Sequence, residues 1–171
     1  MHENYDIDQL LELVENKQFR RLKELLSEMN EVDIAEFMDE VPPEKLIVVF
    51  RLLPKELAAE VFVELETDSQ ELLITGFSNA ELKEVLDELY LDDTVDIIEE
   101  MPASVVKRIL KYSDPEMRRS INEILKYPED SAGSIMTTEF VYLHPDATVE
   151  ESFARIRKVG VDKETIYTCY V

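Results

Sequence analysis

The chain has 171 residues, with 39 Asp and Glu against 18 Lys and Arg and a formal net charge of −21. Its 45% of apolar residues is enough to bury the core of one domain, or of one domain and a fragment of another. So acidic a chain is unsuited to sequence-independent nucleic-acid binding or to docking on an anionic membrane, because both require Lys and Arg. We therefore expect cations, metals or basic proteins as partners, and no nucleic acid.

Glycine and cysteine are scarce. Three Gly in the whole chain leave no GxGxxG or GxxxxGK motif, which disfavours a nucleotide-dependent enzyme. Cys169 is the only cysteine, so the chain has no internal disulfide and no cysteine-based metal site, as is typical of a reducing compartment. No apolar run approaches the roughly 20 residues that span a bilayer. The sequence as given is expected to be soluble and cytosolic.

Pairs of adjacent apolar residues recur with a period of 12. These pairs are Phe37-Met38, Val49-Phe50, Val61-Phe62, Leu73-Ile74, Val85-Leu86, Ile97-Ile98 and Ile109-Leu110. A third apolar residue follows three positions after each pair, except in the last repeat, where Ser113 takes its place. Residues with this spacing form one stripe on a helix. Two further helices, over residues 10–14 and 22–29, are expected before these repeats.

Helix-start signals separate the stripes. Ser78 with Glu81, and Ser113 with Glu116, have the spacing of a capping box, and Pro115 suits the first turn of a helix. Helices of about eight residues are not stable alone and must bury their stripes against neighbours. The sequence therefore predicts a mainly α fold, a superhelical array of short helices. An irregular helical bundle is the alternative.

The pattern changes after residue 127. Residues 128–134 (PEDSAGS) are typical of a turn-rich linker. Beyond them we expect a strand over 140–143, an amphipathic helix over 149–159 and a β-rich strand over 165–171. Such a short α/β segment has too little core to fold alone, so we interpret it as a truncated second domain.

Two segments carry a family resemblance. Residues 135–141 (IMTTEFV), followed by 145–152 (PDATVEES), resemble the opening of a cystathionine-β-synthase-type (CBS) domain. Preceded by residues 127–133 (YPEDSAG) and an acidic helical array, they resemble the cytosolic amino-terminal part of MgtE-type magnesium transporters. The resemblance implies an N domain over residues 1–130, and a linker with an incomplete α/β CBS fragment over 131–171.

The resemblance also implies a function. In that family a homodimer with a transmembrane pore binds Mg²⁺ between its N domains and CBS domains, which closes the pore when cytosolic Mg²⁺ is high. The chain is then a non-enzymatic regulatory portion on the cytoplasmic side of the membrane. Its ligand is Mg²⁺, with Ca²⁺ or Mn²⁺ as substitutes, and its partners are the remaining CBS and transmembrane domains.

The most acidic stretch, residues 84–100, contains no Lys or Arg. Mg²⁺ prefers oxygen ligands and typically takes one or two carboxylates together with several waters. Asp92 and Asp96 are four residues apart, so they share a helix face and can attract one hydrated ion. The alternative is structural, with Asp92 as a helix N-cap and Asp93 and Asp96 in the first turn.

The resemblance adds Glu60 to this stretch. The family places sensor carboxylates at the positions of Glu60, Asp92 and Asp96, with Asp93 as a weaker candidate. From its own surroundings, Glu60 is equally an ordinary solvated residue.

Two other functions remain open at this stage. The array could be a protein-interaction adaptor, because flagellar motor-switch proteins share a related array of short helices, and scattered carboxylates could belong to an acidic hydrolase. A cluster of cations before the linker indicates either a solvated face or contact with an acidic surface of the missing domains. It consists of Lys107, Arg108, Lys111, Arg118, Arg119 and Lys126.

Overall fold

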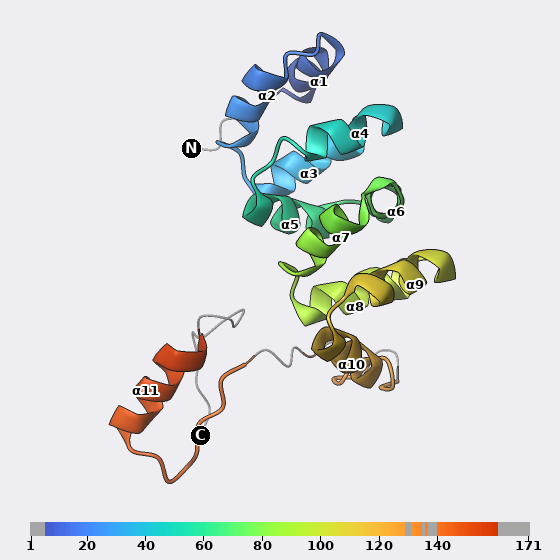
Figure 1. The fold of residues 1–171 in the computed structure, drawn as a ribbon. Coiled ribbons are helices and arrows are strands. Elements are labelled where there is room, and N and C mark those ends of the chain that lie inside the picture. The colour runs from blue at the N-terminus through green and yellow to red at the C-terminus, as the bar shows by residue number, and fades with distance from the viewer. Residues whose placement is uncertain (1–5, 129–130, 135, 137–139, 161–171) are drawn as a thin grey trace.

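The computed structural model describes residues 6–128, 131–134, 136 and 140–160, which form helices joined by turns and irregular segments (Figure 1). The helices are α1 (Ile7–Glu15), α2 (Phe19–Leu26), α3 (Glu31–Asp39), α4 (Pro43–Phe50), α5 (Lys55–Glu64), α6 (Thr67–Gly76), α7 (Asn79–Leu86), α8 (Leu91–Glu100), α9 (Ala103–Tyr112), α10 (Pro115–Ile124) and α11 (Val149–Val159). The predicted mainly α fold is confirmed for these residues.

The first ten of these helices follow one register. Each of α1 to α10 begins 12 residues after the one before, from Ile7 to Pro115. The repeat therefore extends beyond the stripes at 37–113 and includes both amino-terminal helices.

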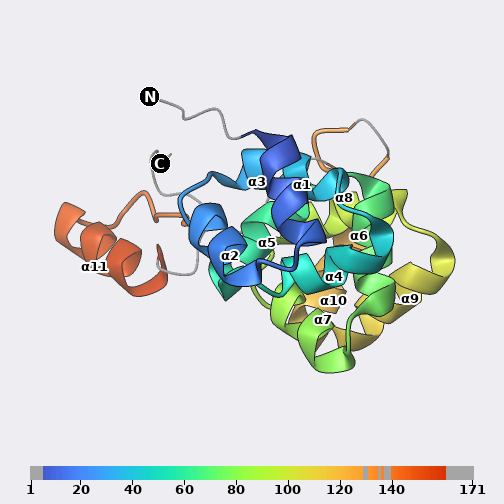
Figure 2. The same ribbon diagram turned by 90° about the horizontal axis from the view of Figure 1, so that it is seen from above.

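Most helices of the array pack against the helix two positions further along the chain. Helices α1, α3, α5, α7 and α9 contact one another in sequence and form one row, while α4 packs on α6 and α8 on α10. The result is an elongated stack running from α1 to α10, seen from the side in Figure 1 and from above in Figure 2. The predicted superhelical array is confirmed, and the bundle alternative is wrong.

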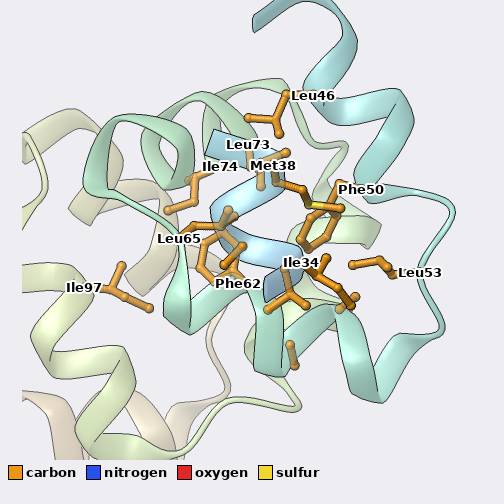
Figure 3. Packing of buried hydrophobic residues seen from close by; sticks show 14 of the residues in the cluster. Ile34, Met38, Leu46, Phe50, Leu53, Phe62, Leu65, Leu73, Ile74 and Ile97 are labelled. Carbon is orange, nitrogen blue, oxygen red and sulfur yellow. The ribbon is translucent and has the colours of Figure 1, made fainter. Parts of the chain in front are cut away.

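The stripes supply the core between the rows (Figure 3). The ring of Phe50 lies edge-on to Phe62, with centroids 6.2 Å apart, and 5.4 Å from Phe77. Ser113, the polar residue in the stripe pattern, is also buried, and its Oγ donates to the carbonyl of Ile109 at 2.9 Å. That hydrogen bond makes a hydroxyl tolerable at an apolar position.

The two predicted capping boxes have different outcomes. Ser78 and Glu81 form one at the start of α7, as predicted. Ser113 does not cap α10. Instead, the carboxylate of Asp114 accepts from the backbone N–H groups of Glu116 and Met117 at 2.7 and 3.0 Å. The prediction for Ser113 was wrong because its hydroxyl is already used within α9.

The segment after the array is only partly as expected. Helix α11 forms, with a capping box between Thr148 and Glu151; none of its residues is buried, and it lies apart from the stack (Figure 1). Residues 140–143 are irregular, so the predicted strand there is wrong; within the described residues no strand runs beside them to complete its hydrogen bonds. The strand predicted at 165–171 lies outside the described residues.

In the described part of the chain, no helix is both long and apolar enough to cross a membrane.

Candidate metal-binding face

Helix α8 carries three of the four predicted metal ligands. It begins at Leu91 with Tyr90 as its N-cap, so Asp92 and Asp93 lie in the first turn and Asp96 in the second. The interpretation of Asp92 as an N-cap is therefore wrong. Leu91 and Val95 are buried, and the helix register that buries them places Asp92 one position inside the helix. There its negative charge suits the positive end of the helix dipole.

Asp92, Asp96 and Glu100 follow one another at intervals of four residues along α8, and they therefore share one face. Partial burial of its carboxyl, and then the charges of Asp92 and Glu100, raise the pKa of Asp96. Oδ1 of Asp92 is buried and has no hydrogen-bond partner. From α6, the hydroxyl of Thr67 donates to Glu100. A buried acceptor without a partner costs free energy, which a bound cation would recover.

Glu60 and Asp93 meet in a separate acidic groove of about 470 Å³ next to this face. The groove lies between the start of α3, one side of α5 and the turn that leads into α8. Its carboxylates are Glu31, Glu56, Glu60, Glu64, Glu88 and Asp93, and its apolar part is formed by Ala59, Val63, Leu89 and Tyr90. Glu60 and Asp93 thus line one groove, while Asp92 and Asp96 share a face of α8.

Every Lys and Arg in residues 31–100 already forms an ion pair. Residues 31–100 contain 21 Asp and Glu but four Lys and Arg. All four form ion pairs, at 2.5 to 2.6 Å: Lys45 with Glu15, Arg51 with Glu81, Lys55 with Glu88, and Lys83 with Asp87. Four cations cannot neutralise 21 carboxylates, so residues 31–100 keep a large excess of negative charge that ions or partners from outside can neutralise.

Within the described residues, no group of three or more His, Cys, Asp or Glu side chains is arranged to hold a metal ion. Oxygen donors suit a hard cation such as Mg²⁺, which typically takes one or two carboxylates and keeps several waters. The face therefore supplies carboxylates of the kind that a hydrated Mg²⁺ ion takes, but it does not supply a complete set of ligands.

Sequence reasoning included Glu100 in the acidic stretch without singling it out, and it missed Thr67. Glu100 could have been found from the spacing, because it continues the series from Asp92 and Asp96. Thr67 lies 33 residues away in sequence, and only the folded array shows that the start of α6 reaches Glu100 at the end of α8.

A protein-family model described as the MgtE intracellular N domain matches residues 29–130. The chain belongs to this family. The predicted resemblance to MgtE transporters is therefore confirmed. The chain is 36% identical to the magnesium transporter MgtE of Thermus thermophilus over 166 residues, which are 95% of this chain and 37% of that protein. It is 21% identical to MgtE of Bacillus subtilis over 159 residues, 93% of this chain and 35% of that protein.

Two crystal structures have the same fold. One is the cytosolic domain of the Mg²⁺ channel MgtE in complex with ATP, with a TM-score of 0.84 and 35% identity over 97% of this chain and 68% of that one. The other is the soluble part of a magnesium transporter, with a TM-score of 0.76 and 26% identity over 96% of this chain and 65% of that one. The chain thus spans little more than a third of the full-length MgtE relatives.

Proposed function

We propose that this chain is the Mg²⁺-sensing regulatory part of a magnesium transporter, a binding module without enzymatic activity on the cytoplasmic side of the membrane. Residues 1–130 form its N domain, and residues 131–171 form a linker and the first part of a CBS domain. Membership of the MgtE N-domain family and the fold shared with the cytosolic domain of a Mg²⁺ channel support this function.

The observation that carries the proposal is the buried Oδ1 of Asp92, which has no partner and belongs to the same face as Asp96, whose pKa is raised. Both features report negative charge that is incompletely solvated and incompletely paired. A divalent cation would supply the missing partner and remove the repulsion between these carboxylates. Asp92 and Asp96 would hold the ion directly or through water, and Glu60 and Asp93 would hold another in the groove.

The mechanism follows from the incomplete ligand set. Without Mg²⁺, the acidic face repels other acidic surfaces. Ions bound between this face and the CBS domains of the same homodimeric transporter favour the arrangement in which the ligand sets are complete, because an ion stabilises the state that binds it more tightly. We expect weak sites, suited to an abundant cytosolic ion.

Thermal unfolding with and without MgCl₂ tests the proposal on the chain itself. Mg²⁺ at 10 mM should raise the melting temperature above that in NaCl of equal ionic strength, by a few degrees for a site of millimolar affinity. Asp92→Asn with Asp96→Asn should remove most of this rise. Equal shifts in MgCl₂ and NaCl would show that the face needs the CBS domains to bind the ion, whereas an unchanged Mg²⁺ effect in the double variant would contradict the proposal.

A matched control and a second measurement complete the test. Glu12→Gln with Glu44→Gln removes two exposed carboxylates outside the face and should leave the Mg²⁺ effect intact. In the transporter, Asp92→Asn with Asp96→Asn should weaken inhibition of transport by cytosolic Mg²⁺.

A further inference from the structure

The carboxy-terminal end of the array differs in charge from the rest of it. Residues 103–128 contain six Lys and Arg against three Asp and Glu, the reverse of the balance in residues 31–100. In residues 31–100 every cation is paired with a carboxylate. Within the described residues, none of the six cations of α9 and α10 forms an ion pair.

Two of these six cations donate hydrogen bonds to backbone carbonyls, and the ammonium of a third, Lys111, lies 5.1 Å from the ring centroid of Tyr112. The guanidinium of Arg108 donates to backbone carbonyls at the end of α6, and that of Arg118 donates to the carbonyl of Ser113 at 3.0 Å. The other four are exposed, and we call them the basic end. The basic end consists of Lys107, Lys111, Arg119 and Lys126.

Exposed apolar side chains adjoin the basic end. Leu125 and Tyr127, on either side of Lys126, are 39% and 48% exposed. Helix α10 is the last helix of the stack and packs on α8 (Figure 1). Tyrosine and arginine are enriched at contacts between proteins, and the cations around Tyr127 can pair with carboxylates of a partner.

The acidic groove has the complementary character. It presents six carboxylates, of which Glu88 is paired with Lys55, around an apolar part in which Tyr90 is 40% exposed. The groove is built on α3, α5 and the start of α8, while the basic end is built on α9, α10 and the residues just after α10. We propose that the basic end of one molecule docks in the acidic groove of a second copy, head to tail.

The net charge of −21 makes two copies of the chain repel each other, but salt limits the distance over which this repulsion acts. At about 0.15 M salt, charges more than about 8 Å apart are largely screened, so local complementarity at the contact outweighs the net repulsion. The contact is then weak and sensitive to salt. The groove also contains Glu60 and Asp93, so a Mg²⁺ ion bound there would compete with the contact, and the contact is tested without divalent ions.

Sedimentation velocity over a range of protein concentrations, in 0.15 M NaCl and without divalent ions, tests the proposal. Two variants neutralise one surface each: Lys111→Gln with Lys126→Gln, and Glu56→Gln with Glu64→Gln. Wild type should associate as its concentration rises, and each variant alone should associate about tenfold less tightly or more weakly still. An equimolar mixture of the two variants should form a one-to-one complex, because one partner keeps its groove and the other its basic end.

The controls neutralise exposed charges elsewhere. Lys17→Gln with Lys23→Gln, and Glu12→Gln with Glu44→Gln, should associate like wild type. Wild type that stays monomeric at every concentration, or a variant mixture that stays monomeric, would overturn the proposal. Binding of the monomer to phosphatidylserine vesicles through Lys111 and Lys126, without self-association, would also overturn it and assign the basic end to a lipid surface.

Discussion

The carboxyls of Asp96 and Glu81 have pKa shifts of opposite sign, and each shift records what surrounds the group. Asp96 is exposed as a residue, but desolvation of its carboxyl, and then the charges of Asp92 and Glu100, raise its pKa. Glu81 accepts hydrogen bonds from Arg51 and from Ser78, which lower its pKa to about 2. The ionised Asp96 carboxylate destabilises the fold, and a bound cation would relieve this effect. The ionised Glu81 carboxylate stabilises the fold. The two shifts predict opposite dependences of stability on pH.

Asp96→Asn should stabilise the protein at pH 7 in the absence of divalent ions. Because the folded state binds the Asp96 proton more tightly than the unfolded state, wild type loses stability as the pH rises through the raised pKa. The asparagine variant lacks this loss, so its advantage should shrink as the pH falls towards the ordinary value of 3.8. Denaturant unfolding between pH 4 and 7 measures the difference, with Glu99→Gln on the same helix as the control. Lower stability of Asp96→Asn at pH 7 would contradict this account.

Glu81→Gln should destabilise the protein at pH 7 by about 1 kcal/mol, since it weakens both the capping box of α7 and the pair with Arg51. The folded-state pKa is depressed, so this contribution is present above the ordinary value of 4.5 and is lost as the pH falls towards about 2. Denaturant unfolding extended from pH 7 down to about pH 2 should show wild type and Glu81→Gln converging in acid. A constant difference across that range would point to lost packing instead.

At the scale of the helix, stripes and turns predicted the elements but not the contacts that join them. The helices of the array lie where the period of 12 places them, because each stripe must be buried. The same stripes do not specify which helix lies beside which. Arg108 illustrates the limit: it belongs to a cluster interpreted as a solvated face or a domain contact, yet its guanidinium donates to carbonyls 31 to 34 residues earlier.

Arg108→Met should destabilise the protein by about 1 to 3 kcal/mol, because methionine keeps an apolar stem but leaves the carbonyls of Ile74, Thr75 and Phe77 without a charged donor. Hydrogen exchange should speed up most in the last turn of α6 and in the turn after it. Lys107→Met, at the adjacent exposed cation, is the matched control and should leave both quantities near wild type. Uniform exchange changes across the array would argue against a local capping role.

For the whole molecule, the sequence predicted a superhelical array and an acidic face, and both are present. It did not predict the division of the candidate ligands, with Asp92 and Asp96 on one face of α8 and Glu60 beside Asp93 in a groove. That division depends on the packing of α5 against α3 and α7, which brings together residues about 30 positions apart. The 12-residue repeat makes this packing regular, but the repeat alone does not specify which helices lie in the same row.

The row structure predicts which deletions the array tolerates. Removing residues 55–78, which comprise α5, α6 and their turns, moves α7 into the place of α5 and leaves every later helix in its own row. Removing only residues 55–66 puts α6 in that place and transfers every later helix to the other row. Because stability in stacked repeats comes from contacts with neighbours, the longer deletion should retain cooperative unfolding and the shorter one should lose it. Circular dichroism during thermal unfolding distinguishes them. Equal cooperativity in the two variants would mean that the rows are interchangeable.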